Sequence, residues 1–254
     1  MTSPDALTRF PARFYLEKYY SHVRVENAAF MRAVGDAVAG AGSLGTVVEL
    51  GGGPSLCGLL AMAAATDEGP ARVVWIDAAP SSLDQVAAWL RDDAHAFGYE
   101  AVLRWLAETM GADPAALATR LRAASWHLHC ADLRTGLPAA VRGVGDVVGS
   151  YFLAEAATDQ EPVFVELTRR VGEAAAPGAR VALAYVRRSG PYRLQDATLH
   201  PALAVDESSL PGMLDAAGLR FAELALRRGP RDDPPARPDY EGMVFATGRL
   251  ARPS

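Results

Sequence analysis

Short apolar runs alternate with longer amphipathic segments along most of the chain. The runs are rich in valine, leucine and alanine, and they predict buried strands at 46–50, 72–77, 126–130, 145–152 and 180–186. The segments around them have the apolar spacing of helices, predicted at 14–39, 56–66, 82–94, 99–123 (broken near Pro114), 162–175 and 210–217.

This alternation predicts an α/β domain, because βαβ crossovers join strands of a parallel sheet. Two further strands are predicted at 221–226 and 243–247, and the proline-rich segment 229–238 between them predicts a long hairpin loop. That hairpin adds antiparallel strands at one edge of the sheet. We expect residues 1–254 to form one domain, since too little chain follows the loop for another.

The charge balance narrows the class of partner. The chain has 254 residues, 25 basic and 30 acidic, with a formal charge of −5. A basic nucleic-acid footprint is absent, so we expect no nucleic-acid partner. No apolar run approaches the roughly 20 residues of a membrane span, and the N-terminus lacks signal-peptide features. We therefore expect a cytoplasmic protein, monomeric or homodimeric, acting on a small molecule away from membranes.

Cys57 and Cys130 match no metal-ligand spacing, and we expect no metal. The histidines do not change this expectation. His200 precedes Pro201 in a loop expected over the substrate side, which makes it a candidate site residue.

A glycine turn is the most informative stretch of the sequence. A predicted strand runs into Gly51, Gly52 and Gly53, and a helix follows. Glycines allow a tight turn and a close approach of ligand to backbone. Leu56 occupies the third glycine position of the dinucleotide fingerprint, and no phosphate-loop lysine follows. S-adenosylmethionine, a nucleoside without phosphate, suits such a turn; a turn without ligand is the alternative.

Two acids follow the next two predicted strands. Asp77 ends one strand, where a carboxylate can accept both hydroxyls of a ribose. Asp132 follows another and can accept a hydrogen bond from an adenine amino group. A helix cap or a solvated acid is the alternative for Asp77. The turn and the acids together favour nucleoside binding, but they do not separate NAD from S-adenosylmethionine.

An aromatic segment near the N-terminus, Phe14 to Tyr20, suits a lid over a ligand. Tyr15-Leu-Glu-Lys-Tyr-Tyr20 and Glu49-Leu-Gly-Gly-Gly-Pro-Ser55 resemble the small-molecule amine methyltransferases typified by nicotinamide, phenylethanolamine and indolethylamine N-methyltransferases. The resemblance covers nearly the whole chain and continues through residues 75–77, 89–97, 130–132, 151–159, 176–178 and 239–246.

This resemblance implies a Rossmann-like seven-stranded methyltransferase sheet with an N-terminal helical lid within residues 1–40. It implies S-adenosyl-L-methionine as cofactor, held by Tyr20, Gly51, Gly53, Ser55, Asp77, Asp132, Leu133 and Ser150. On the substrate side it implies Tyr15, Glu155, and Asp239 or Tyr240.

The sequence departs from the family after the fifth strand. Tyr185 stands where the nicotinamide enzyme has a substrate-contacting acid, and Arg187 and Arg188 follow where a relative has acids. A carboxylate stabilises positive charge near an amine, whereas a neutral tyrosine supplies none. The arginines favour an acceptor with a carboxylate or phosphate, or else they mark a solvated strand end.

Two reactions remain open on this scaffold. The first is methyl transfer to the nitrogen of a small amine or N-heterocycle in specialised metabolism, with Glu155 and Asp239 as carboxylates that steady the ammonium. In the second, the amine of S-adenosylmethionine attacks its own γ-carbon, which yields azetidine-2-carboxylate and methylthioadenosine. Tyr185 would then orient that amine.

Overall fold

The apolar runs of the sequence form the strands of one large sheet in the computed structural model, which describes residues 10–193, 199–233, 235 and 239–252. The strands are β1 (Thr46–Leu50), β2 (Arg72–Asp77), β3 (Ser125–Cys130), β4 (Gly145–Tyr151), β5 (Ala175–Val186), β6 (Tyr192–Arg193), β7 (Leu199–His200), β8 (Phe221–Gly229) and β9 (Met243–Leu250).

Seven of these strands pair in the order β3-β2-β1-β4-β5-β9-β8. The first five are parallel to one another, and β9 runs antiparallel to both β5 and β8. The predicted parallel sheet with an antiparallel terminal hairpin is therefore confirmed. β6 and β7 form a separate two-stranded ribbon that the sequence pattern did not predict.

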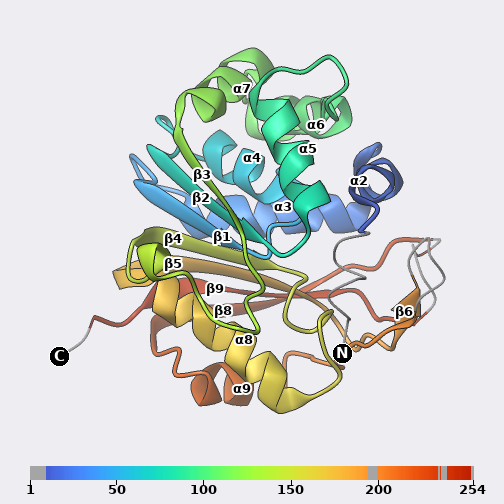
Figure 1. Cartoon of the computed structure of the whole chain (residues 1–254), viewed down its shortest axis with the longest axis vertical. Helices are drawn as coiled ribbons and strands as arrows, with labels where there is room; N and C mark the ends of the chain where they lie inside the picture. Colours follow the sequence, from blue (N-terminus) through green and yellow to red (C-terminus); the bar gives the residue numbers. More distant parts are fainter. Residues whose placement is uncertain (1–9, 194–198, 234, 236–238, 253–254) are drawn as a thin grey trace.

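Helices cover both faces of the sheet (Figure 1). The helices are α2 (Ala12–Tyr20), α3 (Val25–Val38), α4 (Cys57–Ala64), α5 (Pro80–Leu90), α6 (Glu100–Met110), α7 (Pro114–Ala123), α8 (Glu161–Ala174) and α9 (Leu210–Ala216), with a short 3-10 helix at Ala139–Val141. Figure 1 shows α3 to α7 above the sheet and α8 and α9 below it.

Each face of the sheet has its own hydrophobic core. On one side Val47, Trp75 and Ala184 pack with α3 and α4, and on the other Val48 and Tyr185 pack with α8 and α9. Burial on both faces explains why the central strands β1, β2 and β4 are mostly apolar. Because successive side chains of a strand point to opposite faces, neighbouring residues at a strand end reach different layers.

The predicted helix over residues 14–39 is wrong in one respect, since it consists of α2 and α3 with a break at 21–24. The backbone N–H of Arg24 donates to Asn27 Oδ1 (3.1 Å), which satisfies a donor at the start of α3. α2 lies against α5, where the Ser81 hydroxyl donates to Phe10 O (2.7 Å). Residues 1–9 of the expected lid lie outside the described residues.

Within the described part of the chain, no helix is both long and apolar enough to span a membrane. The predicted loop over 229–238 joins β8 to β9 as expected, although residues 234 and 236–238 lie outside the described residues.

Candidate active site

A cavity of about 310 Å³ opens at the carboxyl ends of the parallel strands, which is where open α/β sheets bind ligands. Residues from every strand end of the parallel sheet contribute to its wall, together with α2, the start of α3 and the connection between β8 and β9. Predicted site residues that line it are Tyr15, Tyr20, Gly51, Gly53, Ser55, Asp77, Asp132 and Leu133.

The glycine turn has the backbone shape that its sequence predicts. Gly51 and Gly53 have φ angles of 64° and 58°, a region that favours glycine. A Cβ at Gly51 would lie 2.6 Å from Leu153, whereas one at Gly53 would meet no atom within 4 Å. The turn is therefore closely packed at Gly51 and open at Gly53, which itself lines the cavity.

Two aromatic side chains hold this turn from behind. The Trp75 indole N–H donates to Gly53 O (3.0 Å), and the Tyr99 hydroxyl donates to Pro54 O (2.7 Å). The same hydroxyl accepts from the backbone N–H of Leu56 (3.1 Å). This role of Tyr99 could not be predicted from the sequence, because Pro54 and Leu56 lie far from it along the chain.

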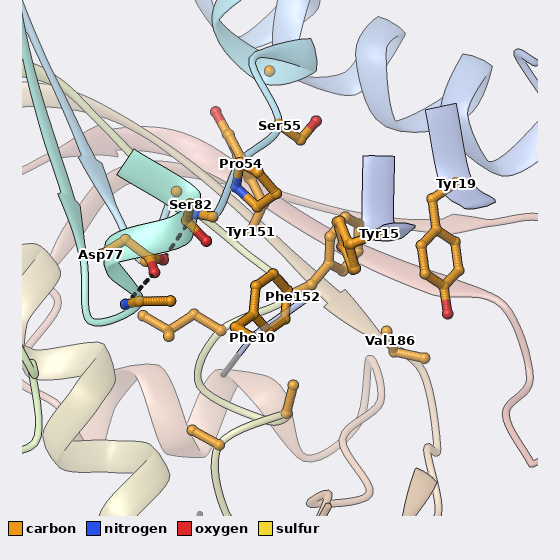
Figure 2. A pocket seen from close by; sticks show the side chains of 18 of the residues that line it. Phe10, Tyr15, Tyr19, Pro54, Ser55, Asp77, Ser82, Tyr151, Phe152 and Val186 are labelled. Atoms are coloured by element: carbon orange, nitrogen blue, oxygen red, sulfur yellow. Dashed lines mark hydrogen bonds between the residues drawn. The ribbon is translucent and has the colours of Figure 1, made fainter. Parts of the chain in front are cut away.

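Asp77 is joined to the turn. Its Oδ2 accepts from the Gly53 N–H (2.9 Å), and its Oδ1 accepts from the Ala79 N–H (2.8 Å) (Figure 2). Burial raises the pKa of this carboxyl, and the two backbone donors oppose that rise. The nearby Ser82 is buried, and its hydroxyl also opposes that rise. It lines the cavity and suits a polar ligand group.

Asp132 and Leu133 form the wall beyond β3. Arg134 donates to both oxygens of Asp132, with Nη2 2.7 Å from Oδ2. These hydrogen bonds lower the pKa of Asp132, so the carboxylate stays ionised. The backbone N–H of Arg134 also donates to Asp132 Oδ1 (3.0 Å), so each oxygen of this carboxylate already accepts two hydrogen bonds from Arg134.

The tyrosines of α2 lie over the cavity. The ring centroid of Tyr15 is 4.8 Å from that of Tyr19 and 6.1 Å from that of Tyr20. Burial raises the pKa of both Tyr15 and Tyr20, so their hydroxyls remain protonated. In Figure 2 the rings of Phe10, Tyr15 and Phe152 gather in the middle of the pocket, with Asp77 and Ser82 to one side and Tyr19 and Val186 to the other.

Tyr185 does not line the cavity, contrary to the sequence expectation. Its side chain is 3% exposed and packs on the opposite face, 5.4 Å from the Phe164 ring of α8. The strand alternation brings Val186 to the cavity instead. The cyclisation hypothesis requires Tyr185 to face the cofactor's amine, whereas its ring packs against α8 on the other side of the sheet.

Three other expected site residues lie outside the cavity wall. The Ser150 hydroxyl donates to Leu50 O (3.2 Å), which ties β4 to β1. Glu155 is fully buried, and its Oε1 accepts from the Val186 N–H (2.8 Å). Asp239 offers its backbone oxygen to the Gly190 N–H, while the next residue, Tyr240, lines the cavity. These groups orient strand ends and loops.

The arginines after β5 are engaged within the fold. Arg187 is 4% exposed and forms ion pairs with Glu207 (2.7 Å) and Glu241. Arg188 pairs with Asp206 at 2.8 Å. Neither lines the cavity, so the alternatives of an anion-binding group and a solvated strand end are both wrong for Arg187.

The cavity also contains residues that sequence reasoning missed or left undecided. His200 lines it and stacks on Tyr192 with centroids 5.2 Å apart. Glu26 and Asp232 line it as well, and no spacing rule connects these two distant acids. Among the described residues, no group of three histidine, cysteine or acidic side chains is arranged to hold a metal ion.

Comparison with known proteins agrees with this geometry. A family model described as the NNMT/PNMT/TEMT family matches residues 1–249. A search of curated proteins finds no match.

Solved structures share the fold at low sequence identity. A DhpI–SAH complex has a TM-score of 0.57 at 17% identity and covers 98% of this chain and 96% of that one. A putative methyltransferase of Haloferax volcanii, solved in complex with the activator Trm112, has a TM-score of 0.56 at 18% sequence identity. That match covers 99% of this chain and 98% of the other. The mitomycin 7-O-methyltransferase MmcR has a TM-score of 0.54 at 17% sequence identity, and the match covers 98% of this chain and 61% of MmcR. The fold is that of S-adenosylmethionine-dependent methyltransferases, which agrees with the expected cofactor.

Proposed function

Because the chain belongs to the NNMT/PNMT/TEMT family, we propose that it transfers a methyl group from S-adenosylmethionine to the nitrogen of a small amine or N-heterocycle of specialised metabolism. The observation that carries this proposal is the hydrogen bond between Gly53 and Asp77 at the wall of a cavity covered by the tyrosines of α2. It joins the two strongest sequence signals for a nucleoside at one place.

The residues on the β3, β2 and β1 side of the cavity suit S-adenosylmethionine. Asp77 and Ser82 suit the ribose, Asp132 and Leu133 suit the adenine, and the open face of Gly53 admits a ligand close to the backbone. When bound, the cofactor supplies an electrophilic methyl group on a sulfonium. The protein's task is then to hold the acceptor nitrogen in line and exclude water.

The cavity extends along the sheet edge beyond the residues that suit the nucleoside. β3 and β9 are five strand positions apart, which corresponds to roughly 24 Å across the sheet edge. Residues that follow β3 and residues that precede β9 both line the cavity. This length supports an arrangement with the cofactor over β3 to β1 and the acceptor over β4 to β8.

The residues around the acceptor part of the cavity favour an apolar amine over an anion. Phe30, Phe152, Tyr192 and Tyr240 line it, and aromatic faces attract cations. Arg187 and Arg188 are bound to acids within the fold. These two arginines are therefore not available as partners for an acceptor with a carboxylate or phosphate.

A product assay tests this function. Purified protein is incubated with S-adenosylmethionine and a library of small amines and N-heterocycles, and S-adenosylhomocysteine is measured. We expect formation that depends on an amine. Methylthioadenosine formed without any acceptor would overturn the proposal in favour of cyclisation, and S-adenosylhomocysteine formed only with phenols would overturn the choice of nitrogen.

A further inference from the structure

Two buried acids, Glu26 and Asp232, line the cavity. Glu26 belongs to the first turn of α3, and Asp232 belongs to the connection between β8 and β9. They are 7% and 6% exposed. Ionisable side chains are seldom buried to this degree without a partner that compensates their charge.

The hydrogen bonds of Glu26 fix one carboxylate oxygen. Its Oε1 accepts from the Asp232 N–H (3.0 Å) and from the Tyr240 hydroxyl. The Glu26 N–H in turn donates to Asp232 Oδ1 (3.2 Å). None of the described residues donates to Glu26 Oε2. One oxygen is thus held rigidly by the protein, and the other is left for a ligand in the cavity.

Two carboxylates, Glu26 and Asp232, and one arginine, Arg24, line this part of the cavity. Arg24 pairs with Asp232, with Nη1 3.7 Å from Oδ2, and Arg231 lies over the Tyr240 ring at 5.2 Å from its centroid. No ion pair to Glu26 is found within the described chain. Burial raises the pKa of Glu26, while the hydrogen bonds from Tyr240 and Asp232 and the charge of Arg24 oppose that rise. A cationic ligand would supply the missing compensation.

Aromatic rings complete the surroundings. Phe30, on the same helix as Glu26, lies 5.4 Å from the Phe152 ring and 4.8 Å from the Tyr151 ring. Phe152 has a φ of 56°, an unfavourable backbone conformation for a non-glycine residue. This strained residue directs its ring into the cavity. An apolar group attached to a cationic nitrogen matches such a lining.

We infer that Glu26, held by Asp232 and Tyr240, is the specificity-determining residue for the acceptor and binds its N–H group through Oε2, so that the acceptor is a basic amine. The inference rests on the proposed function and adds a residue to it. It also explains how the chain recognises an amine although Tyr185 replaces the acid after β5. Glu26 supplies a carboxylate from a different element.

The test measures binding to the protein saturated with S-adenosylhomocysteine, by calorimetry. The probes are benzylamine, phenethylamine and tryptamine, each with its alcohol and carboxylate analogue. For the wild type we expect the amine to bind more tightly than its alcohol and the carboxylate not to bind. Glu26→Gln should weaken the amine by about tenfold or more, the loss of one hydrogen bond to a charged group.

The variants separate recognition from structure. Glu26→Gln should leave the affinity for the alcohols and for S-adenosylhomocysteine unchanged, and Glu68→Gln, an exposed acid away from the cavity, should change neither. Equal weakening of amine and alcohol would overturn the inference. If Glu26→Gln does not fold, Tyr240→Phe provides the same comparison, because it removes a donor that holds Oε1.

The two proposals fail in different ways. If S-adenosylhomocysteine binds but no amine in the series binds, or Glu26→Gln binds amines as well as the wild type, the role of Glu26 is overturned and the cofactor site stands. If S-adenosylhomocysteine itself does not bind, the proposed function fails first.

Discussion

The backbone N–H of Gly53 donates a hydrogen bond of 2.9 Å to Oδ2 of Asp77. The turn after β1 and the acid at the end of β2 are therefore one structural unit. The second oxygen of Asp77 is fixed by Ala79, so the carboxylate is oriented before any ligand arrives. Such preorganisation lowers the cost of ordering side chains on binding.

We predict that Asp77→Asn weakens S-adenosylhomocysteine binding by about tenfold or more, because a charged acceptor of hydrogen bonds is lost. Calorimetric titration measures this change. Asp84→Asn, an exposed position on α5, is the matched control and should bind like the wild type. Equal affinity of the two variants would count against a ribose-binding role for Asp77.

We predict that Tyr99→Phe destabilises the protein by about 1–3 kcal/mol, the cost of leaving buried backbone groups without partners. Pro54 O and Leu56 N–H would both lose the Tyr99 hydroxyl. Urea unfolding measures the free energy, and calorimetry should also detect weaker S-adenosylhomocysteine binding because the turn loosens. A loss of stability with wild-type affinity would show that the turn keeps its shape without Tyr99.

For Tyr185→Phe we predict wild-type affinity for S-adenosylhomocysteine and wild-type turnover, because the ring lies in the core beside α8. Steady-state kinetics with an identified acceptor measures turnover. Tyr20→Phe, which removes a hydroxyl from the cavity wall, is the comparison and should weaken cofactor binding. A marked loss of turnover in Tyr185→Phe would mean that this side chain reaches the reaction after all.

Glu49 gives a prediction about pH. It is 1% exposed, and burial raises its pKa well above the ordinary value. Its Oε2 has no hydrogen-bond partner in the described structure. Between the pKa of the unfolded chain and the higher pKa of the folded protein, the folded protein binds more protons. The free energy of unfolding contributed by this group therefore falls as the pH rises.

Glu49→Gln cannot ionise, so its stability relative to the wild type should increase with pH, by at most about 1.4 kcal/mol per pH unit. Urea unfolding at a series of pH values from weakly acidic to weakly basic measures this difference. Glu68→Gln, an exposed substitution of the same kind, should give a curve parallel to that of the wild type. A parallel curve for Glu49→Gln would contradict the raised pKa.

We predict a structural effect for Arg187→Ala. Removing this buried guanidinium leaves Glu207 without its ion pair and Glu241 with Arg188 alone, which should cost about 1–3 kcal/mol of unfolding free energy. Arg188→Ala, at an exposed position, should cost less than about 1 kcal/mol. Chemical unfolding measures both. Neither variant should change the preference between amines and carboxylates, and a change would restore an anion-binding role.

Much of the candidate site was predictable because its groups stand at strand ends. Adjacent parallel strands end at the same edge of a sheet, so Gly53, Asp77 and Asp132 had to lie near one another once the strands were assigned. Glycine at positive φ and an acid after a buried strand are local features. They are visible in the sequence because their physical cause is local.

Other residues were wrongly predicted to lie in the site, because the sequence does not determine which face of a strand or loop borders the cavity. A shift of one residue moves a side chain to the other layer, which is why Val186 lines the cavity and Tyr185 does not. Ser150 and Glu155 are neighbours in the sequence of residues that line the cavity. Their side chains nevertheless form hydrogen bonds with backbone groups of β1 and β5.

By itself, the sequence determined the order of strands and helices, the glycine turn and the acids that follow the strands, because each depends on hydrophobic period and backbone freedom within a short segment. Only the tertiary structure brought Glu26 next to Asp232 and Tyr240 and enclosed Arg187 among acids. Those contacts join segments far apart in the chain. Their burial and charge balance depend on packing, which no local pattern records.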